Sequence, residues 1–80
     1  MTSADRTLAK MRQNPRDWRI DDLKAVADRL GIDWDHSGTS HCVFRHPGAS
    51  HLSVPAHRPI LPIYIRRFLA LVDAVTKGAS

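Results

Sequence analysis

Apolar residues recur at helical spacing in three stretches of the 80-residue chain, and the first of these runs from Ser3 to Asn14. Its apolar stripe is narrow, so we expect a helix that is either lightly docked or frayed. Asn14 ends it, because the residue before Pro15 avoids the α region. The stripe consists of Ala4, Leu8 and Met11.

The second helical stretch begins at Asp21 or Asp22, after a linker that carries Trp18. Its apolar residues follow the i, i+3, i+4, i+7 spacing of an amphipathic helix. Gly31 is predicted to end it in the left-handed conformation, with Ile32 packing back on the last turn. The periodic residues are Leu23, Val26, Ala27 and Leu30.

The third stretch shows the clearest helical pattern and starts at Pro62, since proline suits the first position of a helix. Steps of about 100° divide it into an apolar and a polar arc. The apolar arc is expected to cover one face of a sheet. The apolar residues are Tyr64, Ile65, Phe68, Leu69, Leu71, Val72 and Val75, and the polar arc holds Arg66, Arg67, Ala70, Asp73, Ala74 and Lys77.

Between the second and third helices, alternation of apolar and polar residues predicts three short strands. They are expected over Ile32–His36, His41–His46 and His51–Val54, with a turn over 47–50. Tight connections permit only an antiparallel meander. The inward side chains are predicted to be Ile32 and Trp34, Cys42 and Phe44, and Leu52 and Val54.

The predicted fold class is α+β, with a three-stranded antiparallel sheet. The order α-β-β-β-α is similar to that of a double-stranded-RNA-binding domain, here with an extra N-terminal helix. A chain of this length forms one domain, 1–80, which we divide into an accessory helix, 1–14, and a core, 15–80.

The charge of the chain is concentrated in its second half. The net charge is +4, yet residues 1–40 hold seven basic and seven acidic side chains, so the excess lies in residues 41–80. This favours a polyanionic partner, although a solvated basic face is the alternative. Cys42 is the only cysteine, which fits a cytoplasmic protein, and no apolar run approaches a membrane span.

The stretch from Gly38 to Arg45 is the best candidate for chemistry. A turn precedes His41, and strand alternation places His41 and Arg45 on one outward face. Histidine takes and gives protons near neutral pH, and a metal-free ribonuclease needs a base, an acid and positive charge near the phosphate. In the plainer interpretation His41 caps the turn and Arg45 is a solvated strand residue.

Four segments of the chain resemble the HicA-type toxins of bacterial toxin–antitoxin pairs. Residues 38–47, GTSHCVFRHP, are similar to the family's Gly-x-Ser-His turn and the strand that follows. Residues 54–57, VPAH, resemble its Pro-x-His segment. Within residues 14–32, the stretches 14–18, 22–23 and 30–32 are similar to the front half of its longer members, and residues 62–69 are similar to their closing helix.

The resemblance implies an endoribonuclease that cleaves messenger RNA without a metal, using His41 for proton transfer. His57 and Arg45 are candidates for support, although His57 is also interpretable as a loop histidine that contacts phosphate. The implied partners are RNA and a HicB-type antitoxin that covers the basic face. The candidate RNA-binding residues are Gly38, Thr39, Ser40, Arg45, Arg58, Arg66 and Arg67.

The sequence is also compatible with other functions. The five histidines lack the spacings typical of metal sites, so we expect no metal and no cofactor. A non-catalytic RNA-binding module of the same fold would show the same charge distribution. An interaction protein that never meets RNA is the third hypothesis.

Overall fold

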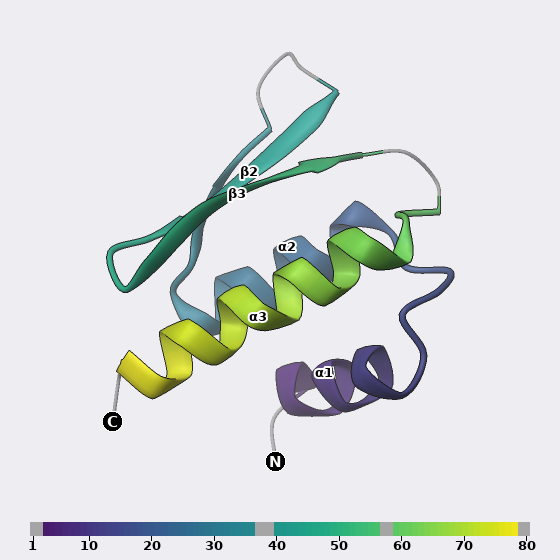
Figure 1. The fold of residues 1–80 in the computed structure, drawn as a ribbon, viewed down its shortest axis with the longest axis horizontal. Coiled ribbons are helices and arrows are strands. Elements are labelled where there is room, and N and C mark those ends of the chain that lie inside the picture. The colour runs from purple at the N-terminus through teal and green to yellow at the C-terminus, as the bar shows by residue number, and fades with distance from the viewer. Residues whose placement is uncertain (1–2, 37–39, 57–58, 79–80) are drawn as a thin grey trace.

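All three helices lie on one side of a three-stranded sheet in the computed structural model of the protein (Figure 1). The structure describes residues 3–36, 40–56 and 59–78. The predicted α+β class and the order of elements are confirmed. The elements are α1 (Ser3–Gln13), α2 (Ile20–Leu30), β1 (Asp33–Asp35), β2 (His41–His46), β3 (Ala49–Pro55) and α3 (Pro62–Gly78).

The sheet is the predicted antiparallel meander, in the order β1-β2-β3. β3 starts at Ala49 rather than at His51, so the predicted turn over 47–50 is too long. The reason is an irregularity between Phe44 and His46, which lets pairing resume between His46 and Ala49 directly across Pro47-Gly48.

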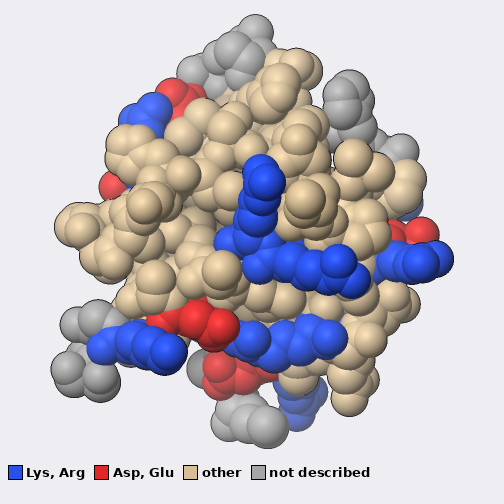
Figure 2. Space-filling model, viewed as in Figure 1, with Lys and Arg blue, Asp and Glu red and all other residues tan. Residues whose placement is uncertain are grey.

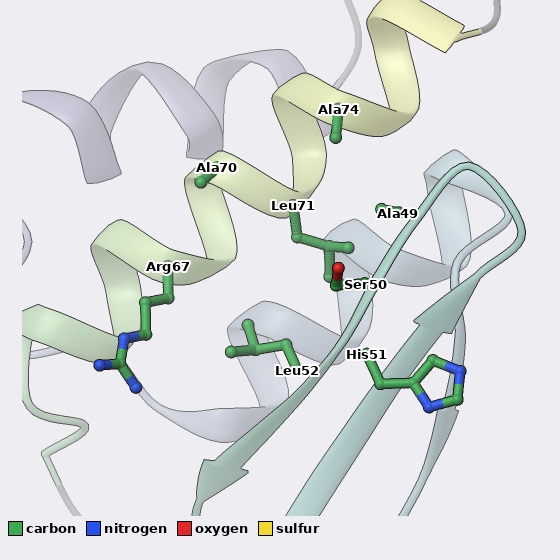
Figure 3. A pocket seen from close by; sticks show the side chains of 8 residues that line it. All are labelled: Ala49, Ser50, His51, Leu52, Arg67, Ala70, Leu71 and Ala74. Atoms are coloured by element: carbon green, nitrogen blue, oxygen red, sulfur yellow. The ribbon is translucent and has the colours of Figure 1, made fainter.

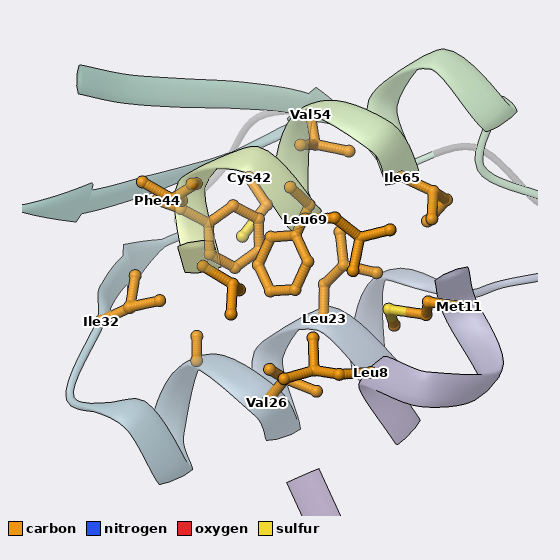
Figure 4. Close-up of a cluster of buried hydrophobic side chains, with 14 of the residues drawn as sticks. Leu8, Met11, Leu23, Val26, Ile32, Cys42, Phe44, Val54, Ile65 and Leu69 are labelled. Carbon is orange, nitrogen blue, oxygen red and sulfur yellow. The ribbon is translucent and has the colours of Figure 1, made fainter. Parts of the chain in front are cut away.

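The core lies between the inner face of the sheet and the helices (Figure 4). Cys42, Phe44 and Val54 point inward and are fully buried, as the alternation predicts. Phe68 of α3 meets Phe44 edge to face, with 5.2 Å between ring centroids. The prediction that α3 covers the sheet with its apolar arc is therefore confirmed.

The prediction of a lightly docked or frayed first helix is wrong. Met11 is 0% exposed and Leu8 belongs to the same buried cluster. α1 packs against both α2 and α3, so a narrow stripe is enough to dock it. The Arg12 guanidinium also pairs with the Asp73 carboxylate of α3.

Backbone hydrogen bonds define both ends of α2. The helix begins at Ile20, one residue before the predicted start, because the Asp22 carboxylate accepts the Arg19 N–H at 3.0 Å. At the other end Gly31 takes the predicted left-handed conformation, with φ of 70°. The Ile32 N–H then donates to the Ala27 carbonyl at 2.9 Å, which brings Ile32 into the core.

Trp34 departs from the prediction of an inward, buried side chain. β1 spans only three residues, and Trp34 is 38% exposed. Its strand is at the edge of the sheet, so its indole lies over the outside of α2 rather than in the core. There the indole N–H donates to Asp28 at 2.8 Å, and Lys24 Nζ lies 4.6 Å from the ring centroid.

Candidate functional site

The outer face of the sheet carries two of the predicted site residues, His41 and Arg45. None of the described helices covers it, since all of them pack on the inner side (Figure 1). The alternation predicted for β2 is confirmed, because His41 and Arg45 are exposed while Val43 between them is half-buried. Asp35 and Ser53 flank Val43 on the neighbouring strands.

One end of this face joins two segments that are far apart in the sequence. His41, the first residue of β2, is level with Pro55 at the end of β3. The Ala56 N–H donates to the Ser40 carbonyl at 2.8 Å, which ties the two chain segments together just beyond the sheet. Four predicted site residues, Gly38, Thr39, His57 and Arg58, fall outside the described residues.

The His41 imidazole is held by its neighbour in the chain. Its Nδ1 lies 3.2 Å from the Ser40 Oγ. If the serine hydroxyl donates, neutral His41 carries its proton on Nε2, and if the hydroxyl accepts, Nε2 is unprotonated. The arrangement in which the hydroxyl accepts from Nδ1–H suits proton transfer at Nε2, because the neutral ring can take a proton there as a base and the imidazolium can give one as an acid.

Arg45 lies on the same face as His41 but at the other end of β2. Four residues of strand separate their Cα atoms by about 13 Å, at about 3.3 Å per residue. His41 and Arg45 therefore share the solvent-facing side of β2 but are separated along it. A side chain at this distance is poorly placed to assist His41 directly.

Arg45 instead lines a shallow hollow at the β2–β3 turn. The hollow has a volume of about 290 Å³ and includes the two histidines on either side of the turn, His46 and His51. The Gly48 N–H donates to His46 Nδ1 at 2.9 Å. The hollow is lined by Asp33, Arg45, His46, Pro47 and His51.

Sequence reasoning considered His46 and His51 only as metal ligands and did not place them in a site. The signal was present, because Pro47-Gly48 is a turn sequence and a hairpin brings its flanking residues together. A metal is not indicated here. No group of three or more His, Cys, Asp or Glu side chains suited to a metal occurs in the described part of the chain.

Two further arginines are exposed on α3, as the polar arc predicts. Arg67 lies with its guanidinium 5.8 Å from the Tyr64 ring centroid and lines a second hollow, between α3 and β3 (Figure 3). Arg66 next to it is also exposed. Figure 2 shows Lys and Arg side chains gathered over the middle of the face that carries α3.

Cys42 is not a candidate nucleophile. Its side chain is buried on the inner face of β2, and burial raises the pKa of its thiol above the ordinary value of 9.0. A protonated, inaccessible thiol reacts slowly, so the position contributes packing.

The chain matches no protein-family model, no curated protein and no solved structure. No helix in the described ranges is both long enough and apolar enough to cross a bilayer.

Proposed function

We propose that the protein is a metal-independent endoribonuclease of the HicA type, a toxin that cleaves messenger RNA. The observation that carries the proposal is the convergence of residues 40–41 and 54–56 at one end of the open sheet face. The pairing of His41 with Pro55 and the hydrogen bond from Ala56 to Ser40 bring these segments together. They belong to the two segments that resemble the family's Gly-x-Ser-His and Pro-x-His motifs.

The proposed reaction uses the 2′-hydroxyl of RNA as the nucleophile. A base removes its proton, the oxygen attacks the adjacent phosphorus, and the bond to the 5′-oxygen breaks as an acid protonates that oxygen. The products are a 2′,3′-cyclic phosphate and a 5′-hydroxyl. His41 performs one of these proton transfers, with its ring positioned by Ser40.

His57 is the candidate for the second proton transfer. Its neighbour in the chain, Ala56, is hydrogen-bonded to Ser40, and this supports the assignment. Arg45 binds the RNA strand rather than assisting His41, because it lies at the far end of β2.

In this proposal the fold is a variant of the double-stranded-RNA-binding arrangement. α2, the three strands and α3 supply the α-β-β-β-α order, with helices on one face of the sheet, and α1 is the addition. The exposed cations Arg66 and Arg67 of α3 contact the RNA backbone.

A HicB-type antitoxin is the proposed protein partner. Burying exposed arginines such as Arg45, Arg66 and Arg67 requires charge neutralisation, so a partner surface that covers them is expected to be acidic. A non-catalytic RNA-binding module remains the second candidate, favoured by the exposed arginines of α3, which binding alone would explain.

Replacement of His41 tests catalysis. His41→Ala should abolish cleavage of messenger RNA and the growth arrest that follows induced expression, because the proton transfer is lost. His41 is exposed at a strand end, so the free energy of unfolding should change by less than about 1 kcal/mol. RNA binding should largely persist, since it depends on the arginines.

The matched control is His36→Ala, which removes an imidazole that has no part in the proposal. It should leave cleavage and growth arrest intact. If His41→Ala cleaves RNA as fast as the unsubstituted protein, the ribonuclease mechanism is wrong. RNA binding that survives in that case would favour the binding module.

A further inference from the structure

Polar and charged side chains make up most of the lining of the hollow at the β2–β3 turn. Its five lining residues include one arginine, two histidines and one carboxylate, which come from all three strands. Its volume of about 290 Å³ is many times that of a single water molecule, which occupies about 30 Å³ in the liquid. The hollow therefore has room for a phosphate group with its hydration water.

The His46 ring has a defined orientation and tautomer. Gly48 N–H donates to His46 Nδ1 at 2.9 Å, so the neutral ring carries its proton on Nε2. A Cβ at position 48 would lie 3.3 Å from the same Nδ1, so only glycine leaves this contact unstrained. The turn thus holds one imidazole N–H as a fixed hydrogen-bond donor.

Arg45 and His51 complete the donor set. Arg45 forms no ion pair with any residue that the structure describes, although Asp33 is its direct partner in register on β1. A guanidinium outside an ion pair can present its planar donors to phosphate oxygens. Figure 3 shows that the ring of His51 points away from α3, and this residue lines the hollow on the open side of the sheet.

We propose that this hollow binds a phosphate group of the RNA strand, a few nucleotides from the phosphate that reacts at His41. The inference rests on the proposed RNA-directed function and adds a second contact point to it. Arg45 supplies the charge, and His46 and His51 supply further donors. Because the hollow lies about 13 Å or more along β2 from His41, one strand crossing the open face would contact both places.

Removal of the Asp33 carboxylate should change RNA binding in the opposite direction from removal of the Arg45 guanidinium. A carboxylate in the lining repels a phosphate and offsets the charge of Arg45. Asp33→Asn should therefore strengthen RNA binding, whereas Arg45→Gln should weaken it. A purely structural role for these two exposed side chains would not produce opposite changes.

The experiment measures binding of a 2′-O-methylated RNA oligonucleotide, which cannot be cleaved, as a function of salt concentration. The logarithm of the binding constant for RNA falls linearly with the logarithm of the salt concentration. Loss of one phosphate contact makes this negative slope less steep by about 1. Arg45→Gln should show this change. The matched control Arg6→Gln removes the same charge from exposed α1, on the far side of the helices, and should leave the slope unchanged.

Two other variants test the same hollow. His51→Gln should weaken RNA binding without a loss of stability, since the residue is exposed. Gly48→Ala should also weaken it, because the new Cβ crowds His46 Nδ1. Equal slopes for Arg45→Gln and Arg6→Gln would overturn the proposal.

Inorganic phosphate separates the two sources of the ligand. In NMR titrations of the unsubstituted protein, phosphate should shift the imidazole signals of His46 and His51 more than chloride does. If phosphate shifts these signals while Arg45→Gln leaves the RNA slope intact, the hollow takes free phosphate and the proposal is wrong. Failure of the proposed catalysis by His41 can be distinguished from failure of this proposal. Arg45→Gln should alter the salt dependence of RNA binding even in a protein that never cleaves RNA.

Discussion

The two faces of β2 are built from neighbouring residues and yet serve opposite purposes. Cys42 and Phe44 point inward and are 0% exposed, whereas His41 and Arg45, directly beside them in the chain, are exposed on the outer face. The inner face is covered by helices, and none of the described elements covers the outer face. Substitutions one residue apart are therefore expected to affect either stability or the proposed binding of RNA, and seldom both.

The largest effect is expected on the inner face, where α3 meets the sheet. Phe68→Ala should lower the free energy of unfolding by about 3–5 kcal/mol, because it removes a fully buried ring and leaves a cavity against Phe44. Urea denaturation followed by circular dichroism measures this change.

The control for this prediction is Leu61→Ala, immediately before α3. Leu61 is 61% exposed, so its truncation should cost no more than about 0.5 kcal/mol. Similar losses for both variants would contradict the distinction between a packed inner layer and a solvated surface.

A smaller effect is expected when a hydroxyl is introduced on either face of β2. Cys42→Ser places a polar group in the core and should cost about 1–3 kcal/mol if the hydroxyl finds no partner. Val43→Thr, one residue along, places a hydroxyl on the open face and should cost no more than about 0.5 kcal/mol. Chemical denaturation of the two variants side by side gives the comparison, and a reversed order would break it.

The inner face also predicts a dependence on alkaline pH. Burial raises the pKa of the Cys42 thiol above 9.0, the ordinary value that applies in the unfolded chain. The unfolded chain therefore loses this proton first, and stability should fall as the pH rises from 9.0 through the higher pKa of the folded state. Cys42→Ala should lack this component, and denaturation curves at several alkaline pH values would detect its absence.

The smallest effect is expected at the surface contact between α1 and α3. The pair Arg12–Asp73 is exposed to solvent, and the hydrogen bond from Arg12 lowers the pKa of the Asp73 carboxyl. Its stabilisation is therefore present above the ordinary pKa of 3.8 and is lost as the pH falls through the lower value of the folded state. Asp73→Asn should cost no more than about 1 kcal/mol at neutral pH, measured by thermal unfolding.

The matched variant at that contact is Met11→Ala. Met11 is on the same helix as Arg12, α1, and is fully buried. Its truncation should therefore lower the free energy of unfolding by about 2–5 kcal/mol. If Asp73→Asn were the more damaging of the two, α1 would be held by its ion pair rather than by its apolar stripe.

Most of the elements were predictable because each carries a periodic pattern. α3 shows a broad apolar arc, and β2 alternates over its whole length, so both were predicted with their inward residues. Trp34 was not, since alternation states which face a side chain is on and not whether another element covers it. The docking of α1 was missed for a related reason, because a narrow stripe gains its contacts from two partners at once.

The candidate site shows the same division. The outward face of His41 followed from local signals, and so did the basic charge of the second half. The approach of Ala56 to Ser40 depends on strand pairing between residues about fifteen positions apart, which no local signal specifies. The grouping of Arg45 with His46 and His51 likewise depends on the irregular register at the hairpin.

The sequence by itself determined the order of the elements, the inner and outer faces of β2 and the apolar arc of α3, because these depend on side-chain periods along one segment. The grouping of two histidines with Arg45 around one hollow, and the position of Trp34 at an edge of the sheet, became visible in the tertiary structure alone. Those outcomes depend on which segments become neighbours. Neighbours are selected by the packing of the whole chain, in which each contact competes with the entropy of closing the loop between its partners.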